Sequence, residues 1–260
     1  MPIRFGILAF PDVQQLDLAG PYEIFASAEG TEVHLVWKDL SPVRSSTGLW
    51  IQPTVTFADC PQLDVLCVPG GSGINALLED EETLDFVRKQ ATRVRYVTSV
   101  CTGSLVLGAA GVLRGRRATT HWNAHDFLVR FGAIPTRGRV VRDGNLITAG
   151  GVTSGIDFGL EVIAELLGQP EAETVQLSLE YAPEPPFHAG TPGRSIARGA
   201  RSDATTPCRI TRTARGVLVP ALSTSMRLRT QIHELGHASV PGRLVRFSNA
   251  AGLMAGSAAR

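Results

Sequence analysis

A cysteine stands where a predicted strand passes directly into a predicted helix. Cys101 follows the predicted strand at 95–100, Arg-Tyr-Val-Thr-Ser-Val, and precedes the mostly small and apolar residues 102–110. Open α/β sheets bind their ligands at the carboxyl ends of the strands, and the free N–H groups at a helix N-terminus lower the pKa of a thiol. We therefore expect Cys101 to act as a nucleophile at a sharp turn. For Cys60 and Cys67 we expect the commoner role of a small buried hydrophobe.

A carboxylate follows the first predicted strand, in the run Leu-Asp-Leu-Ala-Gly-Pro-Tyr-Glu at 16–23. Asp17 would lie at the same carboxyl edge as Cys101, where it can act as an acid or a base. Alternatively, it caps the helix predicted to begin near Pro21 or closes the loop before that helix. Glu23, early in the same helix, is a rival for the acid–base role. Chain position alone leaves both interpretations of Asp17 open.

Two glycine pairs end further predicted strands. Gly70 and Gly71 follow one such strand, and Gly150 and Gly151 follow another. Glycine lets the backbone approach a ligand closely, and the N–H groups of the first pair can stabilise a developing negative charge. A plain tight turn explains the first pair equally well. Neither the Lys-Ser/Thr of a phosphate-binding loop nor the spacing of a dinucleotide fingerprint is present there.

A histidine downstream of the cysteine is a second candidate base. His121 lies in the run Thr-Thr-His-Trp at 119–122, and no histidine follows Cys101 directly. It is either a base for the thiol, as in Cys–His enzymes, or a hydrogen-bonded structural histidine. The sequence does not decide between the two.

Residues 1–180 alternate short β-branched runs with amphipathic stretches, a pattern typical of βαβ units and a mainly parallel sheet. Strands are predicted at residues 3–9, 33–37, 65–69, 95–100 and 146–149, with a small antiparallel ribbon within 47–55. Helices are predicted at residues 21–28, 81–91, 102–110, 123–130, 154–167 and 170–179. The last but one begins with Ser-Gly-Ile-Asp, which resembles a capping box.

The composition fits a globular protein with a substantial core, since 43% of the residues are apolar and 19% are charged. No apolar run approaches the roughly 20 residues needed to cross a bilayer. The apolar part of the first ten residues is too short for a signal peptide. The four cysteines lack the CxxC spacing of metal sites, so we expect a protein of the reducing cytoplasm.

Charge divides the chain into two parts. Residues 191–260 carry eleven Arg against one Asp and one Glu, a net charge of +9, whereas residues 1–190 carry a net charge of −8. A Pro/Gly-rich stretch at 182–193 separates them. We therefore expect a catalytic domain at 1–188 and an atypical basic tail at 189–260, disordered or weakly ordered. An out-of-frame read-through would produce such a tail, and a native, functional tail is the alternative.

The tail also contains His233-Glu-Leu-Gly-His237, which matches a zinc-protease pattern. A catalytic zinc needs a third protein ligand. The extended pattern requires Gly and His further on, but Val240 and Arg243 stand at those positions. We therefore expect no metal site.

Three motifs together resemble the ThiJ/PfpI (DJ-one) superfamily over residues 2–185. They are Val-Pro-Gly-Gly at 68–71, Ser-Val-Cys-Thr-Gly-Ser at 99–104 and Ala-Thr-Thr-His-Trp at 118–122. Leu-Asp-Leu-Ala-Gly-Pro at 16–21, with Asp where many relatives have Glu, and the Pro-rich ending at 179–187 are similar to the isonitrile hydratase branch. The Arg-rich tail departs from that branch, in which a modest helix follows the Pro-rich segment.

The resemblance implies a flavodoxin-like α/β sandwich that forms a homodimer. It also implies hydration of a small apolar isonitrile to an N-substituted formamide without a metal or organic cofactor. Cys101 would attack the terminal carbon and form a thioimidate, Asp17 would move protons and position water, and Thr102 would assist through its N–H or hydroxyl.

We assign substrate binding to Gly70, Gly71, Gly151 and His121. The folded part lacks a basic patch, so we expect neither a nucleic acid nor a membrane as partner.

Two other classes of function remain. One is the ligand sensor of an AraC-type regulator, which requires two helix-turn-helix units after residue 190. The tail lacks the periodic apolar residues of such helices. A glyoxalase-like or redox-sensing thiol protein is the third possibility, and in the sensing case Cys101 would be oxidised. Asp17 does not exclude it.

Overall fold

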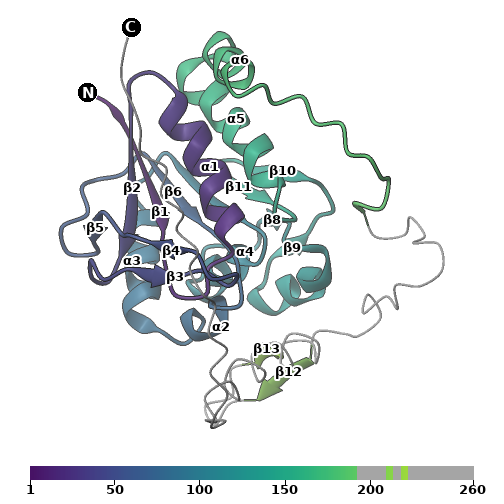
Figure 1. The fold of residues 1–260 in the computed structure, drawn as a ribbon. Helices are drawn as coiled ribbons and strands as arrows, with labels where there is room; N and C mark the ends of the chain where they lie inside the picture. The colour runs from purple at the N-terminus through teal and green to yellow at the C-terminus, as the bar shows by residue number, and fades with distance from the viewer. Residues whose placement is uncertain (192–208, 213–217, 222–260) are drawn as a thin grey trace, which may run out of the picture. The chain divides into compact units, whose positions relative to one another are not determined.

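The computed structural model describes residues 1–191, 209–212 and 218–221. Its centre is a seven-stranded sheet whose neighbouring strands are parallel, except for one antiparallel hairpin at the edge (Figure 1). In spatial order the strands are β10 (Val140–Asp143), β11 (Leu146–Ala149), β7 (Tyr96–Val100), β6 (Val65–Val68), β1 (Ile3–Leu8), β2 (Thr31–Trp37) and β5 (Val55–Thr56). The predicted flavodoxin-like α/β sandwich with a mainly parallel sheet is confirmed.

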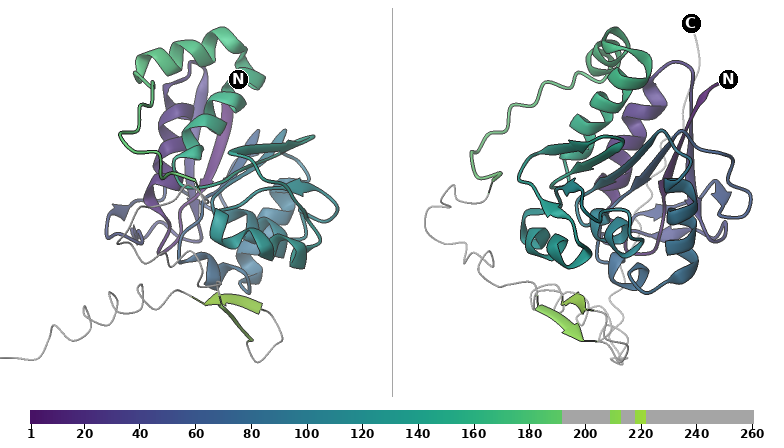
Figure 2. Two further views of the ribbon diagram at one scale, coloured as in Figure 1. Left: turned by 90° about the vertical axis from the view of Figure 1, so that its right-hand side faces the viewer. Right: turned by 180° about the vertical axis from the view of Figure 1, so that it is seen from behind.

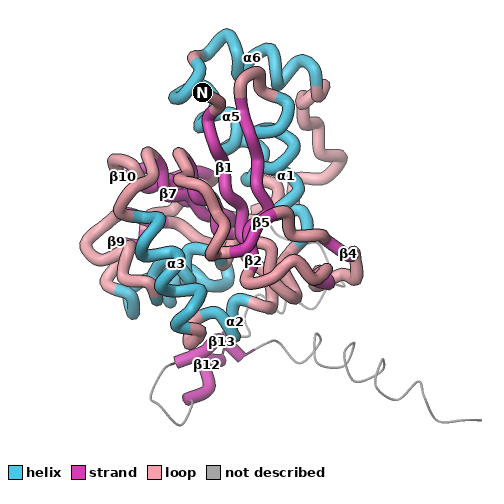
Figure 3. The backbone as a smooth tube through the Cα atoms, turned by 90° about the vertical axis from the view of Figure 1, so that its left-hand side faces the viewer, coloured by secondary structure: helices cyan, strands magenta, loops and turns pink. Residues whose placement is uncertain are grey.

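Helices cover both faces of this sheet (Figure 2). On one face lie α1 (Gln15–Ser27), α5 (Ser154–Leu167) and α6 (Gln169–Ser178), and on the other lie α2 (Ile74–Leu77), α3 (Glu81–Ala91), α4 (Gly103–Ala109) and the 3₁₀ helix η1 (Trp122–Phe131). In Figure 3 the paired strands β1 and β2 stand between α3 and α1. Among the described residues, no helix is long and apolar enough to cross a membrane.

Three short strand pairs complete the described structure. They are β3 (Val43–Arg44) with β4 (Trp50–Ile51), β8 (Arg117–Ala118) with β9 (Ile134–Pro135), and β12 (Arg209–Arg212) with β13 (Leu218–Ala221). The last pair is the part of the predicted basic tail that has a described fold. The predicted disorder of the remaining tail and the motif at 233–237 lie outside the described residues.

Aromatic rings join the central strands to α1 and α5. The rings of Phe5 and Phe25 stack with their centroids 4.2 Å apart, and Phe158 meets Phe25 edge-on at 5.9 Å. All three side chains are fully buried. A Cβ atom on Gly155 would lie 3.0 Å from the ring of Pro21, so this glycine allows α1 and α5 to pack closely. The close packing fixes the ends of both helices at the carboxyl edge of the sheet.

The helix predicted to begin near Pro21 begins six residues earlier, at Gln15, and contains the proline. The sequence prediction treated Pro21 as a start signal, because proline is favoured in the first turn. Here the first turn forms ahead of it, where the N–H of Asp17 already donates to Gln14. This correction moves Asp17 from the preceding loop into the helix.

Smaller corrections concern three other elements. The segment predicted as a helix at 123–130 is the 3₁₀ helix η1, and the predicted ribbon at 47–55 is divided between β4 and β5, which belong to different sheets. The capping box predicted at Ser154 is absent from the described structure, since this residue lies within α5 and its hydroxyl has no hydrogen-bond partner.

Candidate active site

The backbone turns sharply at Cys101, between the end of β7 and the start of α4. Its φ angle is +56°, in the left-handed region that residues with a side chain rarely adopt. The N–H of Cys101 donates to the carbonyl of Ala149 at 3.0 Å, which extends the pairing of β7 with β11 by one bond. A Cβ atom on Gly103 would lie 2.0 Å from the carbonyl oxygen of Val68, so only glycine lets α4 begin against the end of β6.

Two hydroxyl groups donate to the carbonyl of Cys101. The Oγ1 atom of Thr120 lies 2.9 Å from this oxygen and the Oγ atom of Ser104 lies 3.4 Å from it. Both side chains are buried, and Thr120 comes from the segment between β8 and η1. The strained turn is therefore held from its own helix and from a distant segment of the chain.

Asp17 lies in the first turn of α1 and is fully buried. Its Oδ2 atom accepts a hydrogen bond from the N–H of Gly70 at 3.0 Å, and its side chain interacts directly with the thiol of Cys101. The Oδ1 atom is buried without a hydrogen-bond partner in the described part of the chain. The structure thus brings Asp17 to Cys101, and the alternative that Asp17 caps a helix beginning near Pro21 is wrong.

The glycine loop after β6 organises the carboxyl and the neighbouring threonine. The N–H of Gly71 donates to Oγ1 of Thr102 at 3.2 Å. A Cβ atom on Gly70 would lie 2.6 Å from the same Oγ1 atom and 2.9 Å from Oδ2 of Asp17, so no larger residue fits there. We expected these two N–H groups to stabilise charge on a substrate. Both instead donate to side chains of the protein, the N–H of Gly70 to Asp17 and that of Gly71 to Thr102.

Burial dominates the electrostatics of the pair. It raises the pKa of Asp17 from 3.8 to about 7, against the opposing effects of the Gly70 N–H and of Cys101. Burial also raises the pKa of the Cys101 thiol well above its ordinary value, and the negative charge of Asp17 adds to this effect. The N–H of Thr102 acts in the opposite direction. The sequence-based expectation of a lowered thiol pKa is therefore wrong, because the helix N-terminus is outweighed by burial and by the carboxylate.

His121 and Gly151 lie beside each other at the same edge of the sheet. A Cβ atom on Gly151 would lie 3.6 Å from the imidazole ring of His121. The Nδ1 atom of His121 is 2.6 Å from Oδ1 of Asn123, and its ring packs near that of Trp122. Next to it in sequence, Thr120 contacts Cys101. The hydrogen bond to Asn123 fits the structural interpretation of His121, and substrate binding by His121 and Gly151 stays a prediction.

Glu23, the rival carboxylate, is exposed on the outer side of α1. It lines an apolar hollow of about 370 Å³ between α1, the start of α5 and the segment after α6, together with Leu16, Ala19, Gly20, Ile24, Ile156, Leu179 and Tyr181. Neither Cys101 nor Asp17 lines this hollow. In the described structure, Glu23 therefore does not compete with Asp17 for the thiol.

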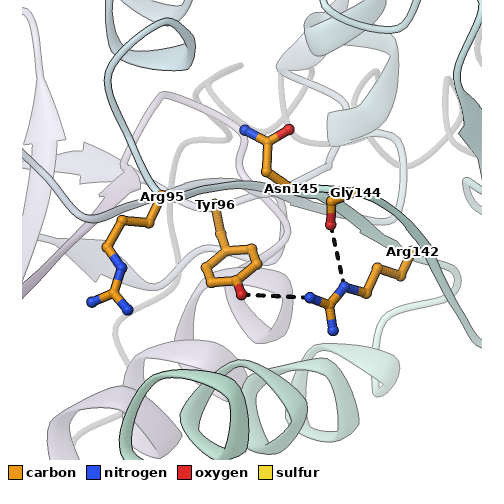
Figure 4. A pocket seen from close by; sticks show the side chains of 5 residues that line it. All are labelled: Arg95, Tyr96, Arg142, Gly144 and Asn145. Carbon is orange, nitrogen blue, oxygen red and sulfur yellow. Dashed lines mark hydrogen bonds between the residues drawn. The ribbon is translucent and has the colours of Figure 1, made fainter.

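A second hollow, of about 300 Å³, lies at the opposite, amino edge of the sheet (Figure 4). It is lined by Arg95, Tyr96, Arg142, Gly144 and Asn145. The guanidinium of Arg142 is already paired with the carboxylate of Glu165 and lies against Tyr96. Within the described ranges, no group of three or more His, Cys, Asp or Glu side chains is arranged to hold a metal ion. The thiol–carboxyl pair is therefore the best candidate for an active site.

Comparison with known proteins places this site in a family. Residues 4–165 match the DJ-1/PfpI family. The chain belongs to the DJ-1/PfpI family. A protein named isonitrile hydratase, from Pseudomonas putida, is 58% identical over 234 residues, which cover 90% of this chain and 96% of the relative. A match of that length includes part of the Arg-rich segment beyond residue 191.

Solved structures of DJ-1/PfpI proteins have the same fold. A ThiJ/PfpI family protein from Pseudomonas syringae is 50% identical, with a TM-score of 0.72 over 74% of this chain and 80% of that chain. DJ-1beta of Drosophila melanogaster is 26% identical, with a TM-score of 0.64 over 70% of this chain and 100% of its own.

Two residues of the site in this DJ-1/PfpI chain, Thr120 and Ser104, were not predicted from the sequence. Thr120 belongs to the motif that contains His121, but no role was predicted for it. Buried hydroxyls usually hydrogen-bond to the backbone, but sequence alone does not show which carbonyl accepts the bond. Both residues hold the turn at Cys101 through such bonds.

Proposed function

We propose that this protein hydrates isonitriles to N-substituted formamides without a metal or organic cofactor. The observation that carries the proposal is the buried pair of the Cys101 thiol and the Asp17 carboxyl. The 58% identity to a protein named isonitrile hydratase supports it. A small, neutral, apolar substrate also suits a site in which burial penalises charge.

The first half of the reaction forms a covalent bond to sulfur. Cys101 gives its proton to Asp17, and Asp17 passes that proton to the terminal carbon of the isonitrile, whose lone pair accepts it. The thiolate then bonds to the same carbon and leaves a thioimidate, R–N=CH–S–Cys101. A carboxyl with a pKa of about 7 is suited to accept and return one proton near neutral pH.

The second half consumes one water molecule. Water adds to the thioimidate carbon, Asp17 takes a proton from it, and that proton passes to the nitrogen. The remaining hydroxyl proton returns through Asp17 to the sulfur as the C–S bond breaks, which releases R–NH–CHO and restores the Cys101 thiol. All atoms of the water molecule are in the product, so the cycle needs no oxidant or reductant.

Thr102, Gly70 and Gly71 support this chemistry in the proposal. The N–H of Thr102 faces the sulfur and stabilises negative charge on it. The N–H of Gly70 holds the carboxyl of Asp17, and the N–H of Gly71 holds the hydroxyl of Thr102. His121 and Gly151, at the same edge, would contact the substituent of the isonitrile.

We further propose a catalytic domain at residues 1–188, a homodimer and a cytoplasmic location. The exposed side chain of Leu16 and the apolar hollow that it lines on α1 support a contact surface between two copies. The unpaired thiols of Cys60 and Cys67 fit a reducing compartment.

The structure weighs against the redox-sensing alternative. Sensor thiols are exposed and have a lowered pKa, whereas Cys101 is buried and its pKa is raised. The helix-turn-helix units required by a regulator would lie after residue 190, where residues 209–212 and 218–221 form strands.

The deciding experiment is turnover of cyclohexyl isocyanide, followed by the appearance of N-cyclohexylformamide. We expect product from the wild type and none from Cys101→Ala, with Cys67→Ala as a control that removes a buried thiol outside the pair. A folded wild-type protein that makes no formamide would overturn the hydratase proposal. Equal turnover by wild type and Cys101→Ala would overturn the role of the thiol.

A further inference from the structure

The peptide between Cys101 and Thr102 carries two groups that matter to the thiol. Its N–H belongs to Thr102 and hydrogen-bonds to the sulfur of Cys101. Its carbonyl belongs to Cys101 and accepts the hydroxyl of Thr120 at 2.9 Å. Because a peptide unit is planar, the direction of the carbonyl fixes the direction of the N–H. A group that holds the carbonyl therefore also aims the N–H.

The turn needs such a hold, because Cys101 adopts a left-handed φ of +56° that a side chain disfavours. On its N-terminal side the residue is fixed by the bond from its own N–H to Ala149. On its C-terminal side the hydroxyl of Ser104 lies 3.4 Å from the carbonyl, which is long for an O–H···O bond. The bond from Thr120 is therefore the stronger of the two.

Thr120 is itself firmly placed. Its neighbour Thr119 donates its N–H to the hydroxyl of Thr148 at 2.9 Å and its hydroxyl to the carbonyl of Gly138 at 3.3 Å. Both threonines are 2% exposed. The hydroxyl of Thr120 thus reaches Cys101 from a segment anchored to the β10–β11 side of the sheet.

We propose that Thr120 is a positioning residue, which holds the Cys101–Thr102 peptide so that the Thr102 N–H faces the sulfur. The inference rests on the proposed role of Cys101 as the nucleophile. It gives the motif at 118–122 a function through Thr120, in addition to the role predicted for His121.

The test measures the acidity of the thiol directly, through alkylation of Cys101 by iodoacetamide as a function of pH. The full-length protein is used, and modification is quantified by mass spectrometry on the tryptic peptide 96–114, which contains no other cysteine. Asp17 is the titratable side chain that interacts with the sulfur. The series is therefore repeated in an Asp17→Asn background, in which the coupled titration is removed.

Thr120→Val keeps the shape of the side chain and removes the hydroxyl, and Thr120→Ser keeps the hydroxyl. Thr119→Val is the matched control, since it removes an equally buried hydroxyl that does not contact Cys101. We expect Thr120→Val to raise the alkylation midpoint by about one pH unit, which lowers the thiolate fraction about tenfold below the midpoint. Thr120→Ser and Thr119→Val should leave the midpoint at the wild-type value.

The same variants separate this proposal from the proposed hydratase activity. If isonitriles are hydrated, kcat should fall in Thr120→Val with little change in KM, and Thr120→Ser should restore it. If the wild type makes no formamide, the midpoint shift still tests the positioning role. An unshifted midpoint in Thr120→Val, or an equal shift in Thr119→Val, would overturn it. Should the valine variant not fold, Thr120→Ala is measured in its place against the same two outcomes.

Discussion

Replacement of Asp17 by Asn should make the stability of the protein much less sensitive to pH. In the wild type, burial raises the pKa of this carboxyl from 3.8 to about 7. The folded state therefore binds the proton more tightly than the unfolded state. It follows that the stability is greatest below the unfolded pKa and is lost as the pH rises through the folded pKa.

The size of the effect follows from the two pKa values. A shift of this size corresponds to a loss of about 4 kcal/mol in the free energy of unfolding once Asp17 is ionised in both states. Part of the loss has already occurred at pH 5, so the change between pH 5 and pH 8 is about 2.5 kcal/mol. The Cys101 thiol adds little in this range, because its pKa is raised well above the ordinary value and it stays protonated.

Urea unfolding at pH 5, 6, 7 and 8 checks this prediction. The free energy of unfolding of the wild type, minus that of Asp17→Asn, should fall steadily across the series, since groups that do not interact with Asp17 contribute equally to both proteins. Glu23→Gln is the control, because Glu23 is an exposed carboxylate on the same helix. Parallel curves for the wild type and Asp17→Asn would refute the argument that burial of Asp17 sets its pKa.

Two further predictions concern the glycine loop and the tail. Gly70→Ala places a methyl group 2.6 Å from Oγ1 of Thr102. It should lower the free energy of unfolding by about 2 kcal/mol and the turnover by about a hundredfold. Urea unfolding and the rate of formamide formation measure the two effects, and an unchanged turnover would contradict the prediction. Removal of residues 191–260 should leave formamide formation intact, and a large loss of activity would show that the tail contributes to the fold or the site.

Local signals were sufficient to predict some elements to the residue. The bounds of α3 (Glu81–Ala91) and α5 (Ser154–Leu167) agree with the prediction, and α5 ends at Gly168, a residue type favoured just after a helix. The start of α1 was missed, since Pro21 is a strong local start signal. Contacts distant in sequence, such as that of Asp17 with Gly70, accompany the earlier start.

In the candidate site, too, local sequence signals predicted some features, whereas features that depend on distant contacts were not predicted. Cys101 was predicted because it lies where a strand passes into a helix at the carboxyl edge of the sheet. Chain position left the role of Asp17 open, and the family resemblance assigned it. The acidity of the thiol was not predictable in this way, because burial and the distance to a carboxylate are properties of the folded chain. Thr120 escaped notice for a related reason. Its bond to Cys101 spans 19 residues, and nothing in the local sequence indicates the acceptor.

The candidate site is complete only when three neighbouring strands in the middle of the sheet have paired. Asp17 follows β1, Gly70 follows β6 and Cys101 follows β7, and these three strands are neighbours. Parallel pairing of strands far apart in sequence is a slow step in folding, because long loops must close first. During synthesis, the thiol of Cys101 is therefore present before β1, β6 and β7 have paired. The suppressed acidity of Cys101 arises only once the three strands have paired, so the nascent thiol is the more exposed to alkylation and oxidation.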